Sequence, residues 1–146
     1  MFLAHNKAMD EGRRIEVATD FRISLPNRPG VLLQMLTLAA QKDINIEGFA
    51  GDIRPGETWA YLHLLFEDQI EEARSILTNA GYEIVSEHEV DVLRVENRVG
   101  AFQDVVRGYT EAGRNIEVFY VAAEGRIVVG TEDMQRHRYG RKMGEI

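Results

Sequence analysis

Apolar and polar residues alternate in some stretches of the chain and follow helical spacing in others. Residues 21–25, FRISL, place an apolar side chain at every second position, which is typical of a strand with one buried face. Residues 31–42 carry apolar side chains at helical spacing, and Pro29 favours a helix start because the first turn needs no N–H donor. Continued along the chain, the pattern predicts strands at 43–53 and 58–66, a helix at 67–81 and a strand at 82–90, in the order β-α-β-β-α-β.

A shortened copy of this pattern begins 70 residues downstream. Seven residues recur at that offset without a gap, where average residue usage predicts about one or two matches in such a window. The pairs are Asn27 and Asn97, Arg28 and Arg98, Gly30 and Gly100, Asn45 and Asn115, Ile46 and Ile116, Glu47 and Glu117, and Phe49 and Phe119. The copy predicts a strand at 89–95, a helix at 100–113 and a shorter hairpin at 115–130. Residues 134–146 leave room for one short helix but not for a closing strand.

Two such units side by side predict an α+β fold. We expect two ferredoxin-like (βαββαβ) units that share an antiparallel sheet, with the helices on one face. The predicted organisation is an N-terminal extension at 1–14, a first repeat at 15–90 and an incomplete second repeat at 91–146, joined without a linker.

The helix-free face of this sheet is expected to be rich in aromatic residues. Alternation along the predicted strands assigns the following side chains to it: Trp59, Tyr61, His63, Leu65, Phe49 and Phe119. An apolar face of this kind is seldom left in water, so we predict that it meets a second copy of the chain in a homodimer or is covered by residues 1–14. The simpler alternative is that Trp59 and Tyr61 are partly exposed strand aromatics.

The overall charge argues against a nucleic-acid-binding surface. The 146 residues carry a formal net charge of −7, whereas nucleic acid is bound by clustered Lys and Arg. A basic cluster near the end of the sequence is either a solvated tail or a site for an anionic partner, and it comprises Arg136, His137, Arg138, Arg141 and Lys142. The chain has no Cys, which excludes disulfides and Cys-based metal sites. No stretch reaches transmembrane length, so we expect a cytoplasmic protein without a membrane or nucleic-acid partner.

The two predicted strand-to-helix turns offer the chemistry of a small-molecule site. The first N–H groups of a helix have no internal partner, so a carboxylate or phosphate can bind there, and a glycine lets it come close to the backbone. Asn presents both a donor and an acceptor, so the pairs Asn27 with Asn45 and Asn97 with Asn115 would suit a zwitterion. The alternative is that these residues are N-caps and turn formers.

The stretch NRPGVLLQMLTLAAQKDINI, residues 27–46, resembles the opening of an ACT domain, a small βαββαβ module that binds amino acids and regulates metabolic enzymes. The resemblance covers residues 17–91 and, more weakly, 90–133, where Val99 replaces the proline. The whole chain is similar to stand-alone tandem ACT proteins, which have no attached catalytic domain.

The resemblance also implies site residues. In the first copy these are Leu25, Asn27, Pro29, Gly30, Val31 and Leu32, with Asn45 and Ile46 reaching in from a neighbouring ACT unit. Asn27 and Asn45 fall where serine-sensing members hold their effector. The equivalent residues of the second copy, which we rank below the first, are Asn97, Gly100, Ala101 and Asn115.

The sequence contains no recognisable catalytic motif. Its four histidines show no metal-ligand spacing, and its glycines form no nucleotide-binding loop, so we expect no cofactor and no metal. Three hypotheses follow: a regulatory protein that senses an amino acid, a ligand-free interaction module, and a small ferredoxin-like enzyme with His63 as its base. We favour the first, and the third depends on whether His63 lines a closed pocket or a subunit contact.

Overall fold

The computed structural model describes residues 15–139. It has seven strands, three α-helices and a short 3-10 turn in this part of the chain. In chain order these are β1 (Ile15–Pro26), α2 (Val31–Gln41), β2 (Gly48–Asp52), β3 (Trp59–Phe66), α3 (Ile70–Asn79), β4 (Glu83–Arg94), α4 (Ala101–Glu111), β5 (Ile116–Ala122), the turn Ala123–Gly125, β6 (Arg126–Thr131) and β7 (Arg136–Arg138). Both predicted β-α-β-β units are present, and the α+β fold class is confirmed.

All seven strands belong to one antiparallel sheet with the order β2-β3-β1-β4-β6-β5, and β7 also pairs with β4. The four strands β2-β3-β1-β4 have the order of a ferredoxin-like unit. The second unit uses the C-terminal half of β4 as its first strand, followed by α4, β5 and β6. Its missing fourth strand is replaced by the N-terminal half of β1, which pairs with β4 from Ile15 opposite Leu93 onward.

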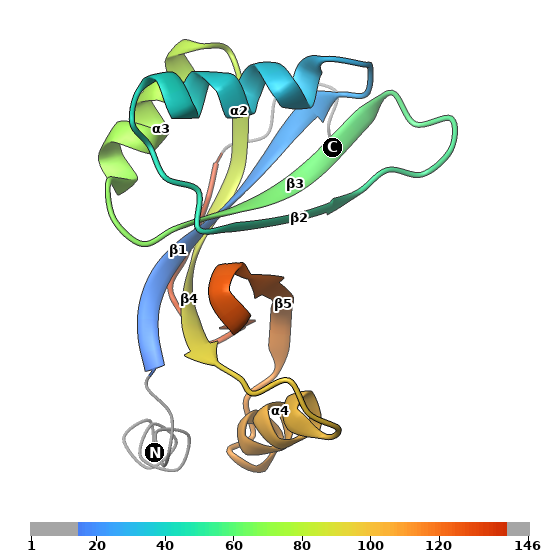
Figure 1. The fold of residues 1–146 in the computed structure, drawn as a ribbon, viewed down its shortest axis with the longest axis vertical. Coiled ribbons are helices and arrows are strands. Elements are labelled where there is room, and N and C mark those ends of the chain that lie inside the picture. The colour runs from blue at the N-terminus through green and yellow to red at the C-terminus, as the bar shows by residue number, and fades with distance from the viewer. Residues whose placement is uncertain (1–14, 140–146) are drawn as a thin grey trace.

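The long strands β1 and β4 therefore serve both units (Figure 1). The strand predicted at 21–25 begins six residues earlier, and the strands predicted at 82–90 and 89–95 are one continuous strand. The predicted boundary between residues 90 and 91 falls inside β4, so the two units meet within a strand.

The helices pack on one face of the sheet, as predicted. Phe21 of β1 is fully buried in the core under α2 and α3, which also contains Met35 and Leu64. Ile15, on the same face of β1, packs with Leu93 in the core under α4. Figure 1 shows α2 and α3 over one end of the sheet and α4 at the other.

The helix-free face closes on itself, because the sheet curls until its two edge strands meet. A Cβ placed on Gly48 of β2 would lie 2.8 Å from the Cβ of Ala122 in β5, and the Ala123 N–H donates to the Glu47 carbonyl oxygen at 3.0 Å. This curl buries a third apolar core between the units: Ala18, Leu65, Val90, Val92, Val118, Ala122 and Val128. The second unit therefore covers part of the face for which we predicted a homodimer contact or residues 1–14; that segment lies outside the described residues.

Two aromatic residues lie on the opposite face from the predicted one. Phe49 is directly across from Leu64, and Phe119 from Val129, and both partners point toward the helices. Residues directly opposite each other on neighbouring strands share a face of the sheet. The cross-strand register therefore decides on which face Phe49 and Phe119 lie, and counting alternate residues across a loop does not. Trp59 remains about half exposed.

The predicted short helix after residue 133 is wrong within the described range. A turn leads directly into β7, whose Arg136 pairs with His88 of β4. The basic residues 136–138 are thus part of the sheet, whereas Arg141 and Lys142 lie outside the described residues. No helix within residues 15–139 is long and apolar enough to cross a membrane.

A buried arginine ties the two units together. The Arg126 guanidinium of β6 donates to Glu47 and to Glu67 of the first unit, each at 2.7 Å. Its side chain is almost fully buried, and both carboxylates are partly buried. Burial raises the pKa of Glu67 above its usual range, although Arg126 acts in the opposite direction.

The close approach at the curl predicts a rescue experiment. Gly48→Ala should lower the free energy of unfolding by about 1–2 kcal/mol, because the added methyl group meets Ala122. Ala122→Gly in the same chain should return part of that loss, and chemical denaturation of both single variants and the double variant measures the coupling. Strictly additive losses would contradict the close contact.

The arginine bridge predicts a pH-dependent loss of stability. Arg126→Leu should cost roughly 2–4 kcal/mol at pH 7, because two partly buried carboxylates lose their partner. Without Arg126 the pKa of Glu67 rises further. Because a raised carboxyl pKa costs stability as the pH rises through it, the loss should be larger at pH 7 than at pH 4 in urea titrations.

Arg94→Leu is the matched control. Arg94 and its partner Glu124 are both largely exposed, so this change should stay within about 1 kcal/mol at either pH. Equal losses from the two variants would show that the bridge contributes nothing.

Candidate ligand-binding site at the turn between β4 and α4

The two repeated turns have the same backbone conformation. Gly30 and Gly100 occupy the N-cap positions of α2 and α4 with φ of 90° and 85°, in the left-handed region that favours glycine. Neither helix receives a side-chain cap. The alternative that Asn27 and Asn97 are N-caps is therefore wrong.

Both turns leave helix N-terminal amides without an acceptor. Within residues 15–139, no hydrogen-bond partner is found for the N–H groups of Phe102 and Gln103 in α4, or of Leu32 and Leu33 in α2. The helix dipole adds partial positive charge at these groups, so each turn can receive an anionic group.

The two copies differ in the hairpin beside the turn. In the first copy the Asn27 side chain donates to the Glu57 carbonyl oxygen at 2.8 Å, and its backbone N–H donates to Thr58 at 2.9 Å. In the second copy the shorter hairpin pairs with β4 only as far as Arg94, followed by one bond from the Val95 N–H to Gly125. Asn97 thus extends past the end of the ladder, and its side chain has no hydrogen-bond partner in the described part of the chain.

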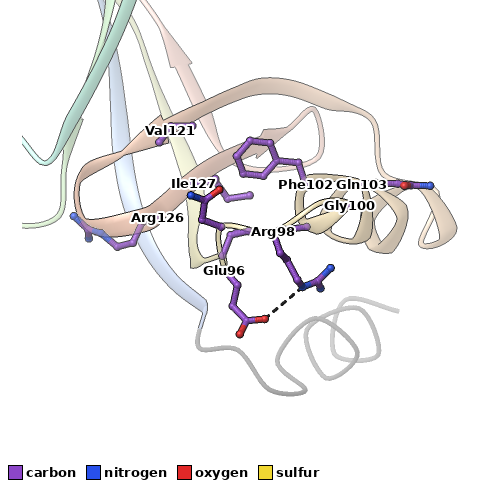
Figure 2. Close-up of a pocket in the computed structure, with 12 residues that line it drawn as sticks. Glu96, Arg98, Gly100, Phe102, Gln103, Val121, Arg126 and Ile127 are labelled. Atoms are coloured by element: carbon purple, nitrogen blue, oxygen red, sulfur yellow. Dashed lines mark hydrogen bonds and ion pairs between the residues drawn. The ribbon is translucent and has the colours of Figure 1, made fainter.

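A pocket of about 630 Å³ opens where the shorter hairpin leaves this space. We call it the turn pocket, and its lining residues come from the turn, the start of α4 and the β5–β6 hairpin. Figure 2 shows Phe102 and Ile127 at its apolar wall, with Val121 beside them and Glu96 and Arg98 at the opposite rim. The Gln103 side chain points away, so this residue presents its backbone.

The rim of the turn pocket carries a positive charge within reach of a ligand. Arg98 donates to Asp104 at 2.8 Å and approaches Glu96 at 3.4 Å, and these hydrogen bonds raise the pKa of its guanidinium. About half of the Arg98 side chain remains exposed, so it can still turn toward a bound anion. Arg126, by contrast, is held by its two carboxylates.

The structure separates the paired asparagines that we expected to act together. Asn27 follows the end of β1 beside the β2–β3 loop, whereas Asn45 precedes the start of β2 at the opposite end of the unit. Asn45 donates to Glu47, and Glu47 accepts from Arg126, which lines the turn pocket. The Glu47 carboxylate therefore connects the first unit to the pocket of the second unit. Asn115 lies outside the pocket and accepts the Glu132 N–H with its carbonyl oxygen.

The remaining predicted residues divide between the pocket and the core. Asn97, Gly100 and Ala101 line the turn pocket. Leu25 and Val31 are buried, and Ile46 packs against the same core. Pro29, Gly30 and Leu32 are exposed and line neither of the two pockets described here. The geometry thus favours the second copy, which we had ranked below the first.

Several lining residues were not predicted. Phe102 is the counterpart of Leu32 at the offset of 70, so extending the repeat by one position would have identified it. Val121 and Arg126 come from the hairpin, where the two copies differ in length, so no offset leads to them.

Comparison with known proteins supports the architecture. No family model matches the sequence, and no curated protein matches it. The regulatory subunit of aspartate kinase from Thermus thermophilus, in its ligand-free form, is similar with a TM-score of 0.59 and 17% identity over 82% of this chain and 85% of that chain. Protein BT0572 from Bacteroides thetaiotaomicron gives 0.60 and 20% over 81% and 80%. The regulatory subunit of aspartate kinase from Thermus flavus gives 0.55 and 17% over 82% and 84%.

These similarities cover both units of the chain, including the truncated second one. At these levels of identity they establish the fold. The chain has the tandem ACT fold that its repeated motif indicates, which it shares with regulatory subunits of aspartate kinase.

Proposed function

We propose that the protein is a non-catalytic regulatory module that binds a free amino acid in the turn pocket. The observation that carries this proposal is the coincidence of three features: amides at the start of α4 without an acceptor among residues 15–139, an Asn97 side chain without a hydrogen-bond partner in the same range, and a pocket that both of them line. The fold shared with regulatory subunits of aspartate kinase supports a regulatory role.

The pocket offers a separate group for each part of an amino acid. The ligand's carboxylate would accept from the N–H groups of Phe102 and Gln103, with Arg98 closing over it. Its ammonium would donate to the Asn97 side-chain oxygen and to the Glu96 carboxylate at the rim. Its side chain would lie along Phe102 and Ile127, which favours a small or apolar residue.

A ligand in the turn pocket would affect the contact between the two units. Arg126 lines the pocket and also holds Glu47 and Glu67 of the first unit. A ligand that shifts this guanidinium changes the bridge, and a coupling of this kind is how binding at one place biases the geometry of another. We propose that a homodimer passes the signal on, with the half-exposed Trp59 and Tyr61 in the contact between the two copies.

A ligand-free interaction module is the second candidate. It is favoured by the first copy, in which Asn27, the counterpart of Asn97, is hydrogen-bonded to the β2–β3 loop. Under this alternative both turns are purely architectural and no amino acid binds.

Thermal denaturation in the presence of each of the twenty amino acids distinguishes the two candidates. A ligand that binds only the folded state stabilises it by about 2.7 kcal/mol at a concentration of 100 times Kd, so Tm must rise. We expect at least one amino acid to raise Tm at millimolar concentration. If none does, the protein is not an amino-acid sensor.

A matched pair of variants identifies which copy is responsible. Asn97→Ala should change the baseline stability by less than about 0.5 kcal/mol, because its side chain has no hydrogen-bond partner among the described residues, and it should abolish the ligand-induced shift. Asn27→Ala loses the bond to Glu57, should cost about 0.5–1.5 kcal/mol and should leave the shift intact. The opposite assignment would move the site to the first copy.

A further inference from the structure

A second pocket, of about 390 Å³, lies on the helix-free face where the two units meet. We call it the seam pocket. It takes its lining from β1, β3, β4, β5 and β7 and shares no residue with the turn pocket. Unlike the turn pocket, it is lined mainly by charged and polar side chains.

The register of the sheet assembles these polar residues in two neighbouring rows. Residues directly opposite each other on adjacent strands share a face, so each row presents its side chains together. Across β3, β1, β4 and β7, one row is His63, Arg22, Ser86 and Arg138, and the next is Leu65, Asp20, His88 and Arg136. The basic residues of β7 thus lie beside polar residues of both units.

Two of the three arginines that line the seam pocket have no ion pair within the described residues. Arg136 is paired with Glu117, but neither Arg22 nor Arg138 has a carboxylate partner among residues 15–139. Arg22 instead stacks over the ring of Tyr61 at 4.5 Å. Two guanidinium groups around one cavity favour an oxyanion, since arginine matches the geometry of phosphate and carboxylate oxygens.

Asp20, one of the two carboxylates that line the pocket, is already engaged. The Asp20 side chain is buried and accepts from His63 Nδ1 at 2.9 Å and from the Tyr120 hydroxyl at 2.6 Å. Burial and the neighbouring Asp20 raise the pKa of Tyr120, so its hydroxyl stays protonated as the donor. The Asp20 carboxylate is therefore hydrogen-bonded to His63 and Tyr120 and not to Arg22 or Arg138.

His88 supplies a buried polar atom with no partner. The residue is only 2% exposed and lines the pocket, and its Nδ1–H donates to the Glu89 carbonyl oxygen at 2.6 Å. Its Nε2 makes no hydrogen bond within the described part of the chain, and the nearest carboxylate oxygen, on Glu117, is 3.9 Å away. Because Nδ1 carries the proton, Nε2 of the neutral ring is an acceptor that needs a donor from outside.

We propose that the seam pocket binds a small oxyanion that also carries a hydroxyl group, of which hydrogen phosphate is the simplest example. Its unprotonated oxygens accept from Arg22 and Arg138, and its hydroxyl donates to His88 Nε2. The oxyanion is then the anionic partner of the basic residues of β7. His63, the one histidine considered as a catalytic base, also lines this binding pocket, where it is hydrogen-bonded to Asp20.

Isothermal titration of the full-length protein with sodium phosphate at pH 7, with ionic strength held constant by NaCl, tests the proposal. We expect saturable binding that Arg138→Gln or Arg22→Gln weakens about tenfold or more, the loss of one charge-assisted hydrogen bond. Arg107→Gln, the same change on the exposed side of α4 outside both pockets, is the control and should alter Kd less than twofold.

Two further comparisons make the test specific. Sulfate has the shape of phosphate but carries no proton at pH 7, so it should bind several-fold more weakly if the hydroxyl meets His88. Asn97→Ala should leave phosphate binding unchanged, which separates this site from the turn pocket. The proposal is overturned if phosphate gives no more heat than chloride, if Arg107→Gln weakens binding as much as Arg138→Gln, or if sulfate and phosphate bind equally.

Discussion

The antiparallel pairing of β1 with β4 is the interaction on which the whole architecture depends. Each of these strands has 12 residues and serves one unit with each half. The second repeat lacks a closing strand of its own, yet its sheet is complete because β1 continues into the vacant position. Removing residues 15–19 from the pairing would thus affect the second unit, although these residues belong to the first repeat. The two repeats therefore share strands and are not separate modules.

The length of one hairpin accounts for the structural difference between two turns of the same backbone conformation. The longer β2–β3 loop reaches back to Asn27 and occupies its side chain. The β5–β6 hairpin is shorter and ends its pairing at Arg94, which leaves Asn97 unengaged and opens the turn pocket. Ala122, at the end of β5 in the same short hairpin, meets Gly48 of β2, so this hairpin takes part in both the curl and the pocket. The two repeats thus share the conformation of the turn, and the shorter hairpin of the second repeat leaves the space for the turn pocket.

The sequence predicted most of the fold because its strands and helices carry strong local periodicity and the repeat confirms them twice. What it could not predict depends on pairing across the sheet. Phe49 was assigned to the wrong face because its side is set by its partner Leu64, 15 residues away. Nor does local pattern predict that the Asn27 side chain is engaged, because its partner Glu57 is 30 residues away. The seam pocket was invisible for the same reason, since Arg22, His88 and Arg138 become neighbours only through register.

We propose that the amides at the start of α4, which have no acceptor among residues 15–139, receive a small zwitterion and that those of α2 do not. Backbone amide chemical shifts, measured by NMR while a mixture of the twenty amino acids is added at millimolar concentration, test it directly. The account predicts saturating changes at Phe102 and Gln103, with Leu32 and Leu33 unaffected. Changes confined to Leu32 and Leu33, or no change at any of the four amides, would contradict it.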